Sequence, residues 1–506
     1  MRFSLLLVLT FSLAARSRAA PHVYPDAKPP INWSKKTAFA WVTPMPSNSV
    51  AAPVLANGRI FLVAEPDTLV CVNAADGKIL WQKSNGADEV LTPDSTKEYR
   101  DRCRQWFTVS VRRFEAELAK VRADRKLMET PDDKELHGIS AKNKTLYHKL
   151  EAERGKYPRF RRHSVKSNIG TAAAAPLVDG NMVYAVFGTG VMVAYDIAGN
   201  RKWSKFLGPV TLKEGQPMAP VMAGKVLGLH FENVFVGMDP ATGKTLWEIG
   251  HGRNLSPKMP GAPSGTPWGM PEGFFVTTGA GIRQASDGAY LCKFGALPYH
   301  GPVVAEGKLW WFSDKRELYG KKLNISNGKV GLERRGIRVA LCDPESKRNF
   351  SFHTGPVIHK GLAYVWDRGG TLIIIDLKSR QVVLDRNVGV GESDSSPVLA
   401  SRFVYLAGNN GTCVVLEQRS KKIETKPGKF IRKLIFPELA RNRLEPCRSG
   451  PIFQGDRMYI RGQRNLYCVK TSAADRKRGE VIDQGLEDMA DDLEKTVDEA
   501  GGLELE

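Results

Sequence analysis

Residues that could bind or act on a ligand recur at one position of a repeated sequence pattern. Eight prolines mark the repeats: Pro53, Pro176, Pro220, Pro267, Pro302, Pro356, Pro397 and Pro451. Three residues before them stand Val50, Ala173, Pro217, Ser264, Tyr299, His353, Asp394 and Arg448. The last five are polar or aromatic. An acid, a base, a histidine and an aromatic ring are a usual makeup for a small-ligand or peptide-terminus site.

We therefore predict a ligand-binding half-ring made of Ser264, Tyr299, His300, His353, Asp394, Ser396 and Arg448. A histidine beside a carboxylate is compatible with proton transfer, although the sequence supplies no distance between them. We assign no catalytic residue. The alternative is a chance gathering of polar side chains at a solvent-filled opening.

The spacing of the prolines predicts the element that positions these residues. It runs from 35 to 54 residues, except for a first interval of 123. A period of about 40 to 50 residues with alternating apolar strands is typical of propeller blades. We predict an all-β protein, an eight-bladed β-propeller of four-stranded blades over residues 38–473. First strands line the channel of a propeller, which would bring the eight positions to one mouth.

The two ends of the repeat array indicate how the ring closes. The eighth repeat stops after Val469, before any fourth strand, whereas Phe39 to Val42 precedes the first repeat and carries Trp41. Pairing this segment into the last blade would leave no exposed edge. Seven blades with a separate N-terminal hairpin remain the alternative. We also predict that Trp81, Trp203 and Trp247 pack between adjacent blades, because each follows a hairpin turn.

The pattern V-x-[VM]-[DN]-x-A-[DT]-G-K-x-L-W, shared by Val70 to Trp81 and Val236 to Trp247, resembles the repeat of the PQQ-like β-propeller family. That family contains quinoprotein alcohol dehydrogenases and the non-catalytic BamB assembly factor. For an enzyme, the resemblance implies a quinone (PQQ) on the axis, a calcium ion, a catalytic aspartate and often a disulfide of adjacent cysteines. None of these is recognisable in the sequence.

We therefore favour a non-catalytic scaffold that binds proteins or a small ligand, without cofactor, over an enzyme. The alternative is a quinone-dependent dehydrogenase with PQQ and calcium. The seven cysteines show no C-x-x-C spacing, which gives no support to a haem or paired-cysteine metal site. Cys71, Cys413 and Cys468 occupy equivalent third-strand positions and are predicted to be small core residues. If a disulfide forms, Cys447 with Cys468 is the least implausible pair.

The N-terminus predicts export. Arg2, an apolar run from Phe3 to Ala15 and a small-x-small site ending at Ala19 are typical of a secretory signal peptide over residues 1–19. The apolar run is too short to span a bilayer. We expect a periplasmic or secreted protein without a transmembrane segment after signal removal.

Residues 94–168 depart from the blade pattern. They hold 20 basic and 12 acidic residues, and an apolar stripe recurs at helical spacing: Tyr99, Cys103, Phe107, Val111, Phe114, Leu118 and Val121. We predict a helical hairpin inserted between blades 1 and 2. Export argues against nucleic acid as its partner. The alternatives are a solvated face on the propeller rim, or binding to an anionic envelope surface or an acidic protein.

The C-terminal segment, residues 479–506, has the opposite charge, with 11 acidic residues and one basic residue. Its apolar residues again recur at helical spacing: Ile482, Leu486, Met489, Leu493 and Val497. We predict an acidic amphipathic helix that docks on the basic insert or on a partner. A mobile acidic tail is the alternative.

Overall fold

The computed structural model describes fourteen stretches of the 506-residue chain. They are residues 22–33, 38–91, 93–154, 170–208, 218–231, 234–250, 267–277, 281–294, 302–313, 317–326, 328–341, 352, 354–426 and 429–476. The predicted signal peptide and the acidic segment 479–506 lie outside them.

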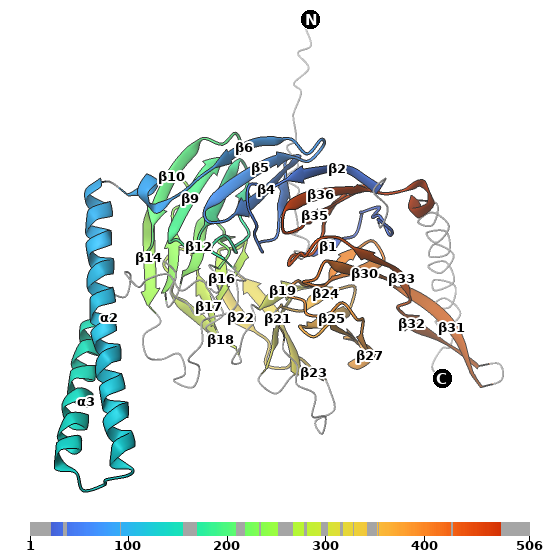
Figure 1. The fold of residues 1–506 in the computed structure, drawn as a ribbon. Helices are drawn as coiled ribbons and strands as arrows, with labels where there is room; N and C mark the ends of the chain where they lie inside the picture. Colours follow the sequence, from blue (N-terminus) through green and yellow to red (C-terminus); the bar gives the residue numbers. More distant parts are fainter. Residues whose placement is uncertain are drawn as a thin grey trace, which may run out of the picture.

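The described strands form nine sheets, of which eight are blades arranged in a ring (Figure 1). Blade 1 contains β3 (Val54–Ala56), β4 (Arg59–Ala64), β5 (Thr68–Asn73) and β6 (Ile79–Lys83). Blade 2 contains β7 (Leu177–Asp179), β8 (Met182–Val186), β9 (Val191–Asp196) and β10 (Arg201–Phe206). Blade 3 contains β11 (Val221–Ala223), β12 (Val226–Phe231), β13 (Val234–Met238) and β14 (Thr245–Gly250). Blade 4 contains β15 (Trp268–Met270), β16 (Phe274–Thr277), β17 (Gly281–Gln284) and β18 (Tyr290–Lys293).

The second half of the chain supplies the other four blades. Blade 5 contains β19 (Val303–Ala305), β20 (Lys308–Phe312), β21 (Glu317–Ser326), β22 (Lys329–Leu332) and β23 (Ile337–Ala340). Blade 6 contains β24 (Val357–His359), β25 (Leu362–Asp367), β26 (Thr371–Asp376) and β27 (Gln381–Asn387). Blade 7 contains β28 (Val398–Ala400), β29 (Phe403–Ala407), β30 (Thr412–Glu417) and β33 (Glu438–Arg443). Blade 8 contains β34 (Ile452–Gln454), β35 (Arg457–Arg461), β36 (Asn465–Lys470) and the N-terminal strand β2 (Phe39–Pro44).

Every anchor proline directly precedes the first strand of a blade, which confirms the predicted eight-bladed fold. First strands of neighbouring blades contact one another, as β3 does with β7 and β19 with β24. Because consecutive strands of a blade are antiparallel, the loops between second and third strands share one face with the segments that lead into the first strands. We call this the mouth face, and the face that carries the other turns the opposite face.

The ring closes as predicted, through the N-terminal strand. β2 pairs antiparallel with β36, with Trp41 opposite Cys468, so the seven-bladed alternative is wrong. A second N-terminal strand, β1 (Val23–Tyr24), runs parallel to β28 on blade 7. Residues 27–33, which follow β1, then pack between blades 7 and 8, where Ile31 and Trp33 are buried. Two N-terminal segments therefore join the last two blades.

A repeated aromatic contact links blades 8, 1, 2, 3 and 4. In each case the tryptophan of one blade's outer strand packs on the turn glycine of the next blade, where a Cβ would lie 2.6 to 2.8 Å from the indole ring. The pairs are Trp41 on Gly77, Trp81 on Gly199, Trp203 on Gly243 and Trp247 on Gly288. The indole N–H of the last three donates to a backbone carbonyl of the next blade at 2.7 to 3.1 Å. This confirms that the predicted tryptophans pack between blades.

The helical insert lies between blades 1 and 2, as predicted, and leaves the ring as a long hairpin (Figure 1). It contains α1 (Ala87–Val90), α2 (Pro93–Leu127) and α3 (Lys134–Arg154). The described part of the predicted apolar stripe remains exposed, with Phe114 at 54% and Val121 at 53% of their surface. Small residues on another face of α2, Ala116 and Ala123, are buried instead. No helix among the described residues is long and apolar enough to cross a membrane.

Cys71, Cys413 and Cys468 are buried on β5, β30 and β36, the third strands of their blades, as predicted. Cys447 and Cys468 are both free, so the disulfide considered for them is not formed. Burial raises the pKa of the Cys71 thiol to about 11. Such thiols behave as small apolar residues rather than as reactive groups.

Replacing Trp203 with alanine should lower the free energy of unfolding by ~3 to 5 kcal/mol, the range for a buried large aromatic. Trp203 is 9% exposed, and its indole donates to the Pro240 carbonyl of blade 3 at 2.9 Å. Leu246→Ala is the control, because Leu246 is 48% exposed, and it should cost less than ~1 kcal/mol. Denaturant unfolding followed by circular dichroism measures both. An equal loss of unfolding free energy in the two variants would mean that packing of Trp203 between blades does not stabilise the propeller.

The closing contact can be tested at the two turn glycines of blade 1. Gly77 and Gly58 have positive φ values of 76° and 69°, so alanine strains both backbones similarly. A Cβ at Gly77 also lies 2.6 Å from the Trp41 ring, whereas nothing lies within 4 Å at Gly58. Gly77→Ala should therefore lower the melting temperature more than Gly58→Ala. Equal shifts would show that the contact of Trp41 with blade 1 adds nothing to closure.

Candidate ligand site at the channel mouth

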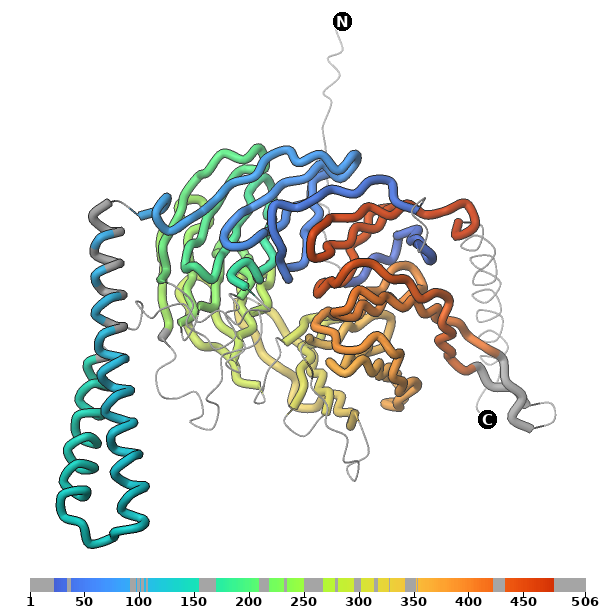
Figure 2. The backbone as a smooth tube through the Cα atoms, in the orientation of Figure 1, coloured from blue at the N-terminus to red at the C-terminus, as the bar shows by residue number. Residues whose placement is uncertain are grey.

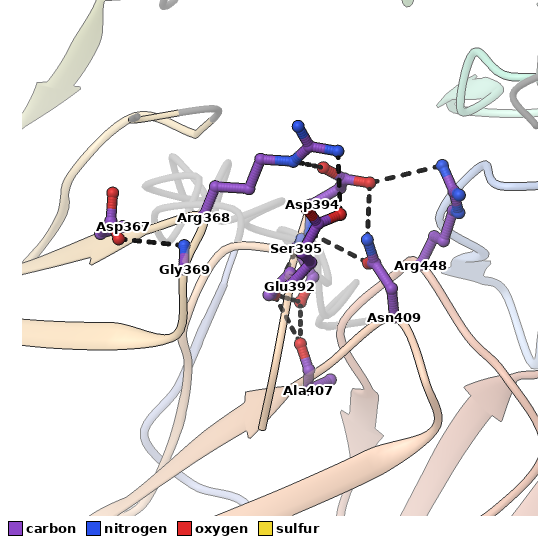
Figure 3. Close-up of polar contacts among 10 residues, drawn as sticks. Asp367, Arg368, Gly369, Glu392, Asp394, Ser395, Ala407, Asn409 and Arg448 are labelled. Carbon is purple, nitrogen blue, oxygen red and sulfur yellow. Dashed lines mark hydrogen bonds and ion pairs between the residues drawn. The ribbon is translucent and has the colours of Figure 1, made fainter. Parts of the chain in front are cut away.

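Blades 6, 7 and 8 bring polar side chains together on the mouth face. Asp394 and Ser396 belong to the segment that leads into β28, and Arg448 to the segment that leads into β34. Arg368 lies in the loop between β25 and β26, and Asn409 in the loop between β29 and β30. Two loops and two segments that lead into first strands thus contribute side chains to one cluster. We call it the mouth cluster, and it consists of Arg368, Glu392, Asp394, Asn409 and Arg448 (Figure 3).

Asp394 is the centre of the mouth cluster. Its Oδ2 atom lies 3.4 Å from a guanidinium nitrogen of Arg448 and accepts a 2.9 Å hydrogen bond from Nδ2 of Asn409. Its Oδ1 atom lies 3.4 Å from Nε of Arg368. The backbone N–H of Asp394 donates to Oδ1 of Asn409 at 3.1 Å. One carboxylate therefore links arginines from blades 6 and 8 to the loop of blade 7.

The backbone around Asp394 is fixed by buried hydroxyl groups. Ser393 and Ser395 both donate to the Ala407 carbonyl, at 2.6 and 3.1 Å. The N–H of Ser393 donates to the Arg368 carbonyl at 2.9 Å, which adds a direct connection between blades 6 and 7. Glu392, by contrast, has a side chain that is 67% exposed and lies 3.1 Å from Arg368. The mouth cluster thus has a rigid base and a charged, solvent-facing edge.

The structure describes three residues of the predicted half-ring, Asp394, Ser396 and Arg448. Asp394 and Arg448, which are 54 residues apart in the sequence, are in contact. Ser396 is half-buried in the same segment as Asp394. Ser264, Tyr299, His300 and His353 lie outside the described residues, so their contribution to a ligand site stays a prediction. The sequence pattern also gave no indication of Arg368 and Asn409, because they come from loops that the proline register does not mark.

Other polar side chains on the mouth face hold blades together. Glu65 accepts hydrogen bonds from the backbone N–H groups of Thr171 and Ala172 at 2.8 and 2.7 Å, which connects blades 1 and 2. Arg461 is 2% exposed and donates to the Ser47 carbonyl at 2.6 Å, which connects blades 8 and 1. Burial lowers the pKa of Arg461 to about 10. The sequence pattern identified neither residue.

A quinone-dependent enzyme of the PQQ-like β-propeller family would need a calcium ion. The mouth cluster does not fit this ion. Calcium takes six to eight oxygen ligands, mainly carboxylates and carbonyls. Here the central carboxylate faces two guanidinium groups, whose charge opposes a second cation. Within the described stretches, no group of three histidine, cysteine or acidic side chains converges as metal ligands would.

A double-mutant cycle tests the mouth cluster as an interaction between blades. Asp394→Asn and Arg448→Gln should together show a coupling of ~0.5 to 1 kcal/mol in the free energy of unfolding, because both side chains are partly buried, at 24% and 28% exposure. Glu392→Gln is the control and should change stability by less than ~0.5 kcal/mol. A coupling of zero would mean that the 3.4 Å contact stabilises nothing.

Comparison with known proteins agrees with the fold. The sequence model of a family described as "Outer membrane protein assembly factor BamB" matches residues 31–103 and 109–256. The structure is similar to BamB from Moraxella catarrhalis, with a TM-score of 0.50 and 9% identity, over 85% of this chain and 99% of that one. Quinohemoprotein alcohol dehydrogenase from Comamonas testosteroni gives a TM-score of 0.47 at 11% identity, over 86% and 77%.

No curated protein matches the sequence. The family match covers blades 1 to 3 and the closing strand β2, which are the segments that carry Trp41, Trp81, Trp203 and Trp247. The family match and the eight-bladed fold confirm the resemblance of this chain to the PQQ-like β-propeller repeat family.

Proposed function

We propose that this protein is an exported, non-catalytic scaffold of the cell envelope that binds a protein partner through its mouth face. The observation that carries the proposal concerns Asp394, the acidic residue at the predicted mouth position. Both of its carboxylate oxygens already contact side chains of the protein. Arg448 and Asn409 occupy one of its oxygens and Arg368 the other. A carboxylate held in this way serves as a fixed charge for recognition.

Proton transfer would require a carboxylate oxygen of Asp394 that can reach the substrate. A general base needs an oxygen within hydrogen-bond reach of the substrate proton that it removes. Both oxygens of Asp394 already face guanidinium or amide groups of the protein. The geometry therefore supports binding better than acid–base catalysis.

The position of the mouth cluster on loops supports a protein as the ligand. Arg368 and Asn409 lie in short loops between second and third strands of the ring, and recognition residues often lie on such loops. Half-buried Arg368 and exposed Glu392 add charges of both signs at the edge of the mouth cluster. The matched family is described as an assembly factor for outer membrane proteins, and the predicted signal peptide would place the chain in the periplasm or outside the cell.

Photo-crosslinking in the producing cells tests the proposal. The crosslinking amino acid p-benzoylphenylalanine replaces Glu392 on the mouth face in one variant, and exposed Lys360 on the opposite face in the other. We expect a discrete protein adduct from position 392 and none from position 360. Asp394→Asn combined with Arg448→Gln should weaken the adduct at position 392. Equal adducts from both faces, or none, would contradict binding at the mouth face.

The visible absorbance spectrum of the purified protein checks the enzymatic alternative. For a scaffold, we expect no quinone band, and no dehydrogenase activity after addition of PQQ and calcium. A new band together with alcohol-dependent dye reduction would replace the scaffold proposal with a quinone-dependent enzyme.

A further inference from the structure

Blade 7 carries a basic β-ribbon. β31 (Arg419–Lys426) and β32 (Lys429–Ile435) form a separate two-stranded sheet between its third and fourth strands. Figure 2 shows this ribbon leaving the body of the ring, on the side away from the helical insert. From Arg419 to Ile435 the sequence holds seven basic residues and one acidic residue. We call this element the basic ribbon.

The base of the basic ribbon is anchored by a buried carboxylate. Glu417, at the end of β30, is fully buried, accepts a 2.9 Å hydrogen bond from Nε of Arg402 and pairs with Arg419. Burial alone would raise the pKa of Glu417, but hydrogen bonds and charges from Arg419 and Arg402 outweigh it and lower that pKa. The ribbon therefore starts from a fixed, charged position on the ring.

The register of the basic ribbon places like charges opposite each other. Lys421 pairs with Lys433, and Lys422 with Arg432. Like charges on directly opposite residues destabilise a two-stranded sheet. Lys421 and Lys433 are exposed, and neither forms an ion pair with any residue that the structure describes. An anionic partner along the ribbon would offset this repulsion.

The described end of the chain lies close to the strand that follows the ribbon. Asp475 accepts a 3.3 Å hydrogen bond from the N–H of Ile31, and the Ile31 carbonyl accepts a 2.9 Å hydrogen bond from Asn442. Asn442 belongs to β33, which is separated from the end of β32 by only two residues. The helical insert instead leaves the ring between blades 1 and 2, on the other side of the molecule (Figure 1).

We propose that the acidic C-terminal segment 479–506 docks on the basic ribbon of its own chain. The segment carries 11 acidic residues and one basic residue, so its charge is opposite to that of the ribbon. At ~3.3 Å per extended residue, a ribbon strand of eight residues is about 26 Å long, which 28 residues of chain can follow. Docking there would cover a surface that otherwise attracts anionic ligands. It differs from the two docking sites predicted from the sequence, which were the basic insert and a partner.

Crosslinking within the full-length purified protein tests this contact. In one variant p-benzoylphenylalanine replaces Ser420, which is exposed on β31 and uncharged, and in the other it replaces exposed Ala141 on α3. We expect adducts between position 420 and residues 479–506 at 50 mM salt, and a yield at least fivefold lower at 1 M salt because exposed charges are screened. Position 141 should give no adduct with the segment.

Charge reversal and isotope labelling complete the test. Lys421→Glu with Lys433→Glu should abolish the adduct, whereas Lys142→Glu with Lys149→Glu on α3 should leave it unchanged, at equal melting temperatures. Mixed ¹⁵N-labelled and unlabelled protein distinguishes docking within one chain from docking between copies. Adducts from position 141 alone, adducts only between copies, or no adduct from position 420 would each overturn the proposal.

Discussion

Contact between the tryptophan of one blade and the turn glycine of the next is the interaction on which ring assembly most visibly depends. Each blade is a small sheet that cannot bury both of its apolar faces alone, so it needs a neighbour on each side. The indole fits only because glycine has no Cβ and tolerates positive φ. Trp41 repeats this contact from the N-terminal strand, so ring closure uses the same interaction as blade stacking.

The tryptophan contacts described above end at blade 4, and other interactions join the later blades. The segment from Ala27 to Trp33 packs between blades 7 and 8, and Asp394 links blades 6, 7 and 8 on the mouth face. The sequence match to the known family also ends at residue 256, close to the last of these tryptophans. The part of the ring that departs from the repeat is therefore the part that carries the mouth cluster and the basic ribbon.

The sequence predicted the features that depend on local, repeated chemistry. Prolines before first strands, glycines in tight turns and Trp41 without a partner strand were enough to predict eight blades and their closure. It did not predict β1, Arg368 or the basic ribbon, because these depend on contacts between distant residues or on a hairpin without the repeat pattern. For the insert, the apolar stripe predicted a helix, but small residues such as Ala116 pack more closely than Phe114 and make the buried contact instead.

The rigidity of the ring gives its charged extensions fixed directions. The basic ribbon begins two residues after the buried Glu417 of β30, and the helical insert begins beside blade 1, so both start from ordered strands. Both carry an excess of basic residues, and placing that charge on extensions keeps it solvated and away from the apolar core. The basic charge of the extensions is thereby kept apart from the packing of the propeller, whereas the charged mouth cluster links three blades directly.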